Sequence, residues 1–214
     1  MEKTVYKVTI KLTEPLLGTV ACSKSIWRDY ITTKMEKDLK KEGKTDDQIK
    51  EEIDQTLEAV PETDELDKGL TSFFLDPDKG YHLRDYQIRA FFKSAAKAQK
   101  EYGAMKQLRS KVVEYLFIRP SRIYLAKPKA ELEVVERPLR ASTPQGERVA
   151  IARSHSIPAD TEIAFEVHSL HDVLPEKLIR ELLSYGEYCG LGQNRGSGFG
   201  RFEVVSFAEK GKRD

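Results

Sequence analysis

The residues best suited to binding chemistry gather in one glycine-rich stretch near the end of the sequence. Positions 190–201 read GLGQNRGSGFGR, with five glycines in eleven consecutive positions. A dinucleotide-binding GxGxxG follows a strand and opens a helix, whereas this stretch follows an expected helix and opens a strand, and it lacks the Gly-Lys-Ser/Thr of a P-loop. Glycines allow positive φ values, close approach of a second backbone, and access of phosphate oxygens to main-chain amides. The stretch therefore predicts a structural turn packed on its own sheet, or a nucleic-acid contact made by Gly192, Gln193, Asn194, Arg195, Gly196, Ser197, Gly198 and Arg201.

A second group of basic residues lies in a stretch with the features of a long hairpin. Between positions 137 and 153, four arginines stand against one acid, Glu147. Guanidinium groups suit phosphate because of their planar fork, and they also stack on bases. Arg137, Arg140, Arg148 and Arg153 are therefore nucleic-acid-binding candidates, and a solvated hairpin with scattered charges is the alternative.

Three further binding candidates lie in the first half of the chain. Arg89 and Lys93 are four residues apart in an expected helix and share a face, so they either follow one nucleic-acid backbone or form a solvent-facing stripe. Trp27, the only tryptophan, is either a base-stacking platform in the loop after the first strand or an anchor of that loop to the core.

The composition is that of a folded protein with an uneven distribution of charge. Of the 214 residues, 39% are hydrophobic and 33% charged, and the net charge is +1. Positions 36–68 hold 13 acidic and 6 basic residues, a net of −7, so the remainder carries +8. A basic body with an acidic insert is typical of a polyanion-binding protein, although a solvated surface gives the same excess.

The apolar runs and the cysteines further restrict the class of protein. No apolar run approaches the roughly 18 residues of a membrane span, and the N-terminus enters a strand pattern directly, which predicts a cytoplasmic protein without membrane contact. Cys22 and Cys189 lie in no metal-binding spacing, so neither a structural metal nor another cofactor is expected.

The hydrophobic pattern predicts an ordered series of elements. Strands are expected at 5–12, 112–118, 122–125, 161–167 and 199–207, helices at 84–102 and 174–189, a linker at 61–80, and a hairpin at 132–157. In the helix at 84–102, a broad apolar face is assigned to Tyr86, Ile88, Ala90, Phe91, Phe92, Ala95, Ala96 and Ala98. Thr45 is expected to cap an acidic helix, with Gln48 as its reciprocal partner.

Without its insertions, this order is βαββαβ, which defines an α+β fold with a ferredoxin-like or RRM-like core. We expect a single domain over 1–214, with an acidic helical insertion at 35–67 after the first strand and a protruding basic hairpin at 130–158 between the middle strands. Many functions use this core, so the order narrows the function only modestly.

Three stretches resemble the RAMP superfamily, the RRM-like proteins that include backbone subunits and guide-processing nucleases of CRISPR systems. The run GLGQNRGSGFGRF at 190–202 resembles the glycine-rich loop before the last strand of that superfamily, and EPLLG at 14–18 resembles the end of its first strand. The run DYQIRAFFK at 85–93 resembles the polar loop and basic first helix of the backbone subunits. The combination, with ERPLR at 136–140 and QGERV at 145–149, also resembles a group of phage-encoded proteins.

The resemblance implies a function and an assembly. In RAMP backbone subunits, single-stranded RNA runs across the core while a hairpin of one copy covers the next copy's segment. The implied function is therefore binding of a single strand, RNA first and DNA second, by copies or related subunits arranged side by side. A protein-interaction module that uses the acidic insertion is another possibility.

The resemblance also implies the alternative of a small endoribonuclease. Some backbone subunits cut RNA with an aspartate in the loop after the first strand, where Asp29 lies in this chain. Guide-processing relatives use a histidine to take the 2′-hydroxyl proton, for which His82 and His155 are the candidates. His168 and His171 have no third ligand in the sequence and are expected to be surface residues rather than a metal site.

Overall fold

The computed structural model describes residues 3–22, 45, 47–48, 69–125, 132–144, 146–171 and 173–213. The chain forms two compact units: unit 1 holds residues 1–17, 82–126 and 157–214, and unit 2 holds 18–81 and 127–156.

Most of the expected acidic insertion lies outside the described residues. Within it, the main-chain N–H of Thr45 donates to Gln48 Oε1 (3.2 Å) and that of Gln48 to Thr45 Oγ1 (3.4 Å), so the predicted capping pair is confirmed.

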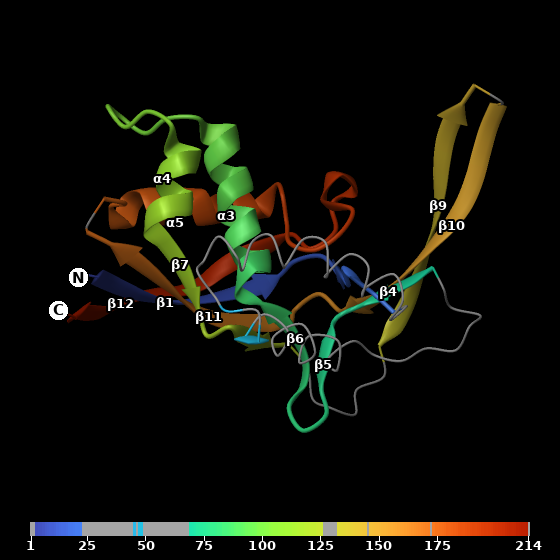
Figure 1. Cartoon of the computed structure of the whole chain (residues 1–214), viewed down its shortest axis with the longest axis horizontal. Coiled ribbons are helices and arrows are strands. Elements are labelled where there is room, and N and C mark those ends of the chain that lie inside the picture. The colour runs from blue at the N-terminus through green and yellow to red at the C-terminus, as the bar shows by residue number, and fades with distance from the viewer. Residues whose placement is uncertain are drawn as a thin grey trace. The chain divides into compact units, whose positions relative to one another are not determined.

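Unit 1 is built on a four-stranded antiparallel sheet (Figure 1). Its order is β12 (Phe202–Arg213), β1 (Lys3–Leu12), β11 (Glu162–Leu170) and β7 (Leu116–Arg119). The unit also holds α3 (Asp85–Gln99), α4 (Leu108–Tyr115), α5 (Glu176–Ser184), two short strands β2 (Leu16–Leu17) and β8 (Arg122–Tyr124), and the 3₁₀ turns Tyr185–Glu187 and Arg195–Ser197. The end of β6 (Gly80–Arg84) pairs with β8. Helices and antiparallel sheets together confirm the α+β class.

The core of unit 1 lies between the sheet and the helices. Val8, Ile10 and Leu12 alternate along β1 and are at most 1% exposed, so one face of the central strand is buried. The buried side of α3 meets that face, where the rings of Phe91 and Phe202 lie 5.0 Å apart in an edge-to-face contact. Burial of each such side chain stabilises the fold by roughly 1.5–3 kcal/mol, which explains why the apolar periodicity of β1 and α3 specifies their positions.

Several predicted boundaries are wrong. The strand expected at 112–118 begins only at Leu116, because Leu108 and Val112 fall four residues apart on the buried side of α4. A short apolar run fits either a strand or a buried helix, so periodicity alone does not separate them. The helix expected to reach 189 ends at Ser184, and the last strand begins at Phe202. None of the described helices is long and apolar enough to cross a membrane.

Unit 2 contains short strands and one long hairpin. Its elements are β3 (Val20–Ala21), β4 (Leu70–Ser72), β5 (Phe74–Asp76), β9 (Glu133–Thr143) and β10 (Gly146–Ile157). β10 pairs antiparallel with β9 over eleven residues of β9 and parallel with β4, and β3 pairs antiparallel with β4. The expected linker at 61–80 is therefore partly strand, and Phe73 and Phe74, at 1% and 0% exposed, are core residues.

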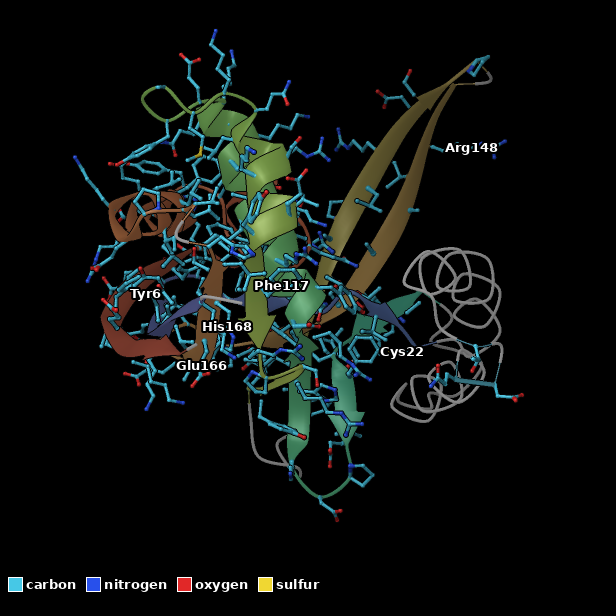
Figure 2. All side chains as sticks on the ribbon, turned by 60° about the vertical axis from the view of Figure 1, so that its left-hand side comes forward. Tyr6, Cys22, Phe117, Arg148, Glu166 and His168 are labelled. Atoms are coloured by element: carbon cyan, nitrogen blue, oxygen red, sulfur yellow. The ribbon has the colours of Figure 1, made fainter. Side chains whose placement is uncertain are left out.

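One charged cluster lies on the sheet face opposite the core of unit 1. Figure 2 shows Glu166 and His168 on β11. Lys210 Nζ lies 2.7 Å from Glu166 Oε1, and His168 Nε2 lies 3.2 Å from Glu166 Oε2. The hydrogen bonds from Lys210 and His168 hold the pKa of the Glu166 carboxyl below its ordinary value of 4.5. His168 therefore has a carboxylate partner, in agreement with its predicted surface role.

Replacement of Glu166 by glutamine is expected to lower the free energy of unfolding by about 0.5–1 kcal/mol at pH 7. Because the folded-state pKa lies below that of the unfolded chain, this stabilisation is full above the unfolded-state pKa and is lost as pH falls through the folded-state pKa. Urea unfolding of Glu166→Gln and the native protein should therefore converge on acidification. Glu162→Gln, an exposed carboxylate on the same strand face, is the control, and an equal pH-dependent loss in this variant would contradict the assignment.

Candidate nucleic-acid interface

The root of the glycine-rich loop is fixed by main-chain contacts. The N–H of Gly200 donates to the carbonyl of Pro15 (2.8 Å), and the N–H of Leu191 donates to the carbonyl of Gly200 (2.9 Å). A Cβ on Gly190 would overlap the backbone of Gly200, and a Cβ on Gly192 would lie 2.5 Å from the carbonyl oxygen of Leu17. Gly192 and Gly200 also adopt φ values of +73° and +71°. These glycines are therefore required by the packing of the loop against the chain after β1.

The tip of the loop, residues 194–197, has a different character. Asn194 adopts a left-handed conformation with φ 52°, and a single 3₁₀ turn follows at Arg195–Ser197. The N–H of Ser197 donates to the carbonyl of Asn194 (3.0 Å), which closes the turn. Gly196 is exposed, and no atom lies within 4 Å of a Cβ built on it. A ligand therefore has access to the loop tip but not to the loop root.

One arginine lies in the tip and a second lies beside it. Arg195 Nη1 donates to Ser94 Oγ of α3 at 3.5 Å, a long bond, and the guanidinium carbon of Arg201 lies 3.4 Å from the position of a Cβ on Gly198. Among the residues that the structure describes, neither arginine forms an ion pair, and the buried Nε of Arg201 has no hydrogen-bond acceptor. Ser94 was not among the sequence candidates, since one helical serine gives no signal.

The two basic residues predicted to share a face of α3 differ in their surroundings. The guanidinium of Arg89 donates to the carbonyl of Val113 in α4, and its central carbon lies 4.6 Å from the ring centroid of Phe117. Arg89 therefore holds α3 against α4 and β7. Lys93 lies one turn further along, next to Ser94 and the loop tip.

The hairpin arginines lie on both faces of the hairpin. The register pairs Arg153 with Glu136 and Arg140 with Val149, which places Arg140 and Arg153 on one face, whereas Arg137 and Arg148 lie on the other. Arg153 Nε lies 2.9 Å from Glu136 Oε1, and Arg137 donates to Ser154 Oγ at 3.1 Å. Figure 2 shows Arg148 with its side chain pointing away from the ribbon. One backbone lying on one face would meet only two of the four arginines.

Of the weaker candidates, the structure describes only His82 and His155. Trp27 and Asp29 lie outside the described residues. His82 is 1% exposed, with its ring centroid 5.5 Å from that of Tyr124, so a strand on the surface does not reach it. His155 Nδ1 lies 2.7 Å from Ser72 Oγ inside unit 2. In the described parts of the chain, no group of three or more His, Cys, Asp and Glu side chains is placed to hold a metal ion.

Comparison with known proteins shows a shared fold. No protein-family model and no curated protein matches the sequence. The fold is similar to that of a chain in the cryo-EM structure of the Type III-B Cmr-beta bound to cognate target RNA, with a TM-score of 0.51 and 13% sequence identity. The alignment covers 97% of this chain and 61% of that chain, so this chain spans less than two thirds of its length.

Substitution of Gly190 by alanine is expected to destabilise the protein by about 3 kcal/mol, because the new Cβ meets fixed backbone rather than a flexible side chain. Gly196→Ala is the matched control in the same loop. Its Cβ points into open space, so its effect should stay within about 0.5 kcal/mol. Urea unfolding of both variants measures the difference, and equal stabilities would show that the root is not tightly packed.

Proposed function

We propose that this chain binds single-stranded nucleic acid, RNA in preference to DNA, through the loop tip of unit 1 and the adjacent surface of α3. The observation that carries this proposal is the pair Arg195 and Arg201, which lie in and beside a sterically open glycine tip without a carboxylate partner in the described residues. Guanidinium groups in this setting suit phosphate oxygens, since no local acid competes for them.

We further propose that the core is ferredoxin-like and of the RAMP type. In support, the first, second, third and fourth strands of the βαββαβ order correspond to β1, β7, β11 and β12, with α3 and α5 as the two helices. The glycine-rich loop leads into the last of these strands, as it does in the RAMP superfamily. Closeness to the phage-encoded proteins, based on 136–140 and 145–149, stays a prediction.

The preference for RNA follows from two considerations. The chain of similar fold belongs to a structure with bound target RNA. In addition, single-stranded RNA presents unpaired bases together with 2′-hydroxyls, which give a small polar surface such as Asn194 and Ser197 an additional group to recognise. DNA binding of equal strength is the result that would remove this preference.

Side-by-side assembly along the strand is supported by the surface of the hairpin. Val134, Val149 and Ile151 lie on one face and are 47%, 64% and 61% exposed. Exposed aliphatic side chains on a β-hairpin, with Arg140 among them, suit a protein neighbour better than water. We propose that this aliphatic hairpin face contacts a second copy bound to the same strand.

Loss of Arg201 or Arg195 is expected to lower the affinity for a short oligouridylate about tenfold at moderate salt. Each removed phosphate contact should also reduce the slope of log affinity against log salt by about 0.7. Fluorescence anisotropy titrations of Arg201→Ala and Arg195→Ala at several salt concentrations measure both quantities. Arg109→Ala, an exposed arginine of α4, is the control. An equal loss in this variant would show that binding depends only on overall charge.

Disruption of the aliphatic hairpin face is expected to abolish assembly without affecting binding to a short strand. Ile151→Asp places a charge on the proposed contact, whereas Ala150→Asp places the same charge on the opposite face of the same strand. Light scattering on a strand long enough for several copies should show only Ile151→Asp losing the multi-copy species. Equal assembly by both variants would contradict a role for this face.

A further inference from the structure

Part of the helix face that the sequence assigned to the core is exposed. Tyr86 is 53% exposed, and Ala90 and Ala98 are also exposed, so the assignment of these three residues of α3 to the apolar face is wrong. The residues of that face that are buried, as expected, are Ile88, Phe91, Phe92, Ala95 and Ala96. Ala98 lines a groove between α3 and α5.

This groove lies between the last turns of α3 and the stretch from α5 to Tyr188. Ala98 and Gln99 line it on the side of α3, whereas Glu181, Tyr185 and Tyr188 line it on the other side. Its volume is about 290 Å³, at the lower end of the range of small-ligand sites. The groove therefore has room for one ring system rather than for a helix of a partner protein.

The two tyrosines of the groove differ in their surroundings. Tyr185 is half-buried, with its ring centroid 6.5 Å from that of Phe91, so its ring belongs to a fixed wall. Tyr188 is 73% exposed, and its main-chain N–H donates to the carbonyl of Tyr185 (3.1 Å), which holds its backbone. Within the described residues, the Tyr188 side chain makes no hydrogen bond and no ring contact. Its ring is therefore accessible to a flat ligand that enters the groove.

The groove is continuous with the loop tip. The bond between Arg195 and Ser94 places the tip beside the third turn of α3. Ala98 follows Ser94 by four residues, so the two side chains are neighbours on one helix face, about 6 Å apart along the axis. A strand whose phosphate lies at Arg195 would therefore have the groove beside it.

The charge in the groove favours a base over a phosphate. Glu181 lies one turn before Tyr185 in α5, and its Oε2 accepts a hydrogen bond from Gln99 Nε2 (3.3 Å). A carboxylate repels phosphate, but it accepts hydrogen bonds from the amino group of a base such as cytosine. An aromatic ring with a carboxylate nearby thus provides both a stacking surface and an acceptor for the edge of the base.

We propose that the groove takes one base of the bound strand, stacked on the Tyr188 ring in the space that Ala98 leaves open, with Glu181 accepting a hydrogen bond from an amino group of that base. The groove therefore favours cytosine over uracil, whose oxygen at the same position accepts hydrogen bonds instead of donating them. This inference rests on the proposed binding of a single strand at the loop tip, and it adds recognition of a base to the phosphate contacts.

The test of stacking compares two strands of equal length and charge, an oligocytidylate and the same backbone with abasic sites. Tyr188→Ala should weaken binding of the oligocytidylate about 5- to 150-fold and leave binding of the abasic strand unchanged. Tyr188→Phe should retain the native affinity, since stacking needs only the ring. Ala98→Leu, which fills the groove, should weaken the oligocytidylate selectively. Ala90→Leu makes the same change at an exposed position of α3 outside the groove and is the control.

The test of base preference compares the oligocytidylate with an oligouridylate of the same length. The native protein should bind the oligocytidylate about 2- to 10-fold more tightly, the effect of one hydrogen bond. Glu181→Gln should bring this ratio close to one. Glu187→Gln, which removes the same charge from an exposed residue outside the groove, should leave the ratio unchanged. Equal native affinities for the two strands would overturn the role of Glu181.

The outcomes separate this inference from the function on which it rests. Native binding of the oligocytidylate by both Tyr188→Ala and Ala98→Leu would overturn the base site while the proposed function stands. Equal weakening of the oligocytidylate and the abasic strand would show that these variants act only through local structure, which also overturns stacking. If the native protein binds no strand at low salt, the proposed function itself fails.

Discussion

The main-chain hydrogen bonds between the glycine-rich loop and the chain after β1 are the constraint on which the proposed interface depends. Gly200 donates to Pro15, and Thr13 donates to the carbonyl of Arg201 at 2.9 Å, so the entry to β12 is tied to the exit from β1. Because β12 and β1 are neighbours in the sheet, these bonds extend the sheet ladder beyond the strands. The loop therefore leaves the sheet in one direction, and this direction brings Arg195 to Ser94 of α3.

The glycines of this loop serve two purposes at different positions. At Gly190 and Gly200 the backbone is too close to other backbone for any side chain, which is the structural role expected of a turn packed on its own sheet. At Gly196 there is space for a side chain, and because glycine has none, the loop tip stays open to a ligand. Of the two alternatives that the sequence left unresolved, the structural one therefore holds at the loop root, and nucleic-acid contact stays a proposal for the loop tip.

Sequence periodicity predicts the elements in which it extends over the whole element. The prediction fails where a residue type fits both the core and the surface. β1, α3 and the 133–157 hairpin were predictable because alternation or a repeat of 3.6 residues extends over their length. The orientation of α3 was not predictable from the sequence. Tyr86 and Ala90 count as apolar in a periodic pattern, although tyrosine, with its polar hydroxyl, is also common at protein surfaces. The contact of Arg89 with Val113 was not predictable either, since Val113 lies in a helix that the sequence assigned to a strand. The division of the hairpin arginines between two faces follows from the register, which only the structure defines.

The distribution of charge explains how a chain with a net charge of +1 can attract a polyanion. At physiological ionic strength, exposed charges act over about 8 Å, so the local balance decides where phosphate binds. On the sheet face opposite the core, Glu166 pairs with Lys210 and contacts His168, so the Lys210 ammonium already has a carboxylate partner. Around the loop tip, Arg195 and Arg201 form no ion pair with any described residue, and the neighbouring α3 carries no acid beyond Asp85. Two cations without an ion-pair partner among the described residues, Arg195 and Arg201, thus lie at the loop tip, which supports the proposed position of the strand there.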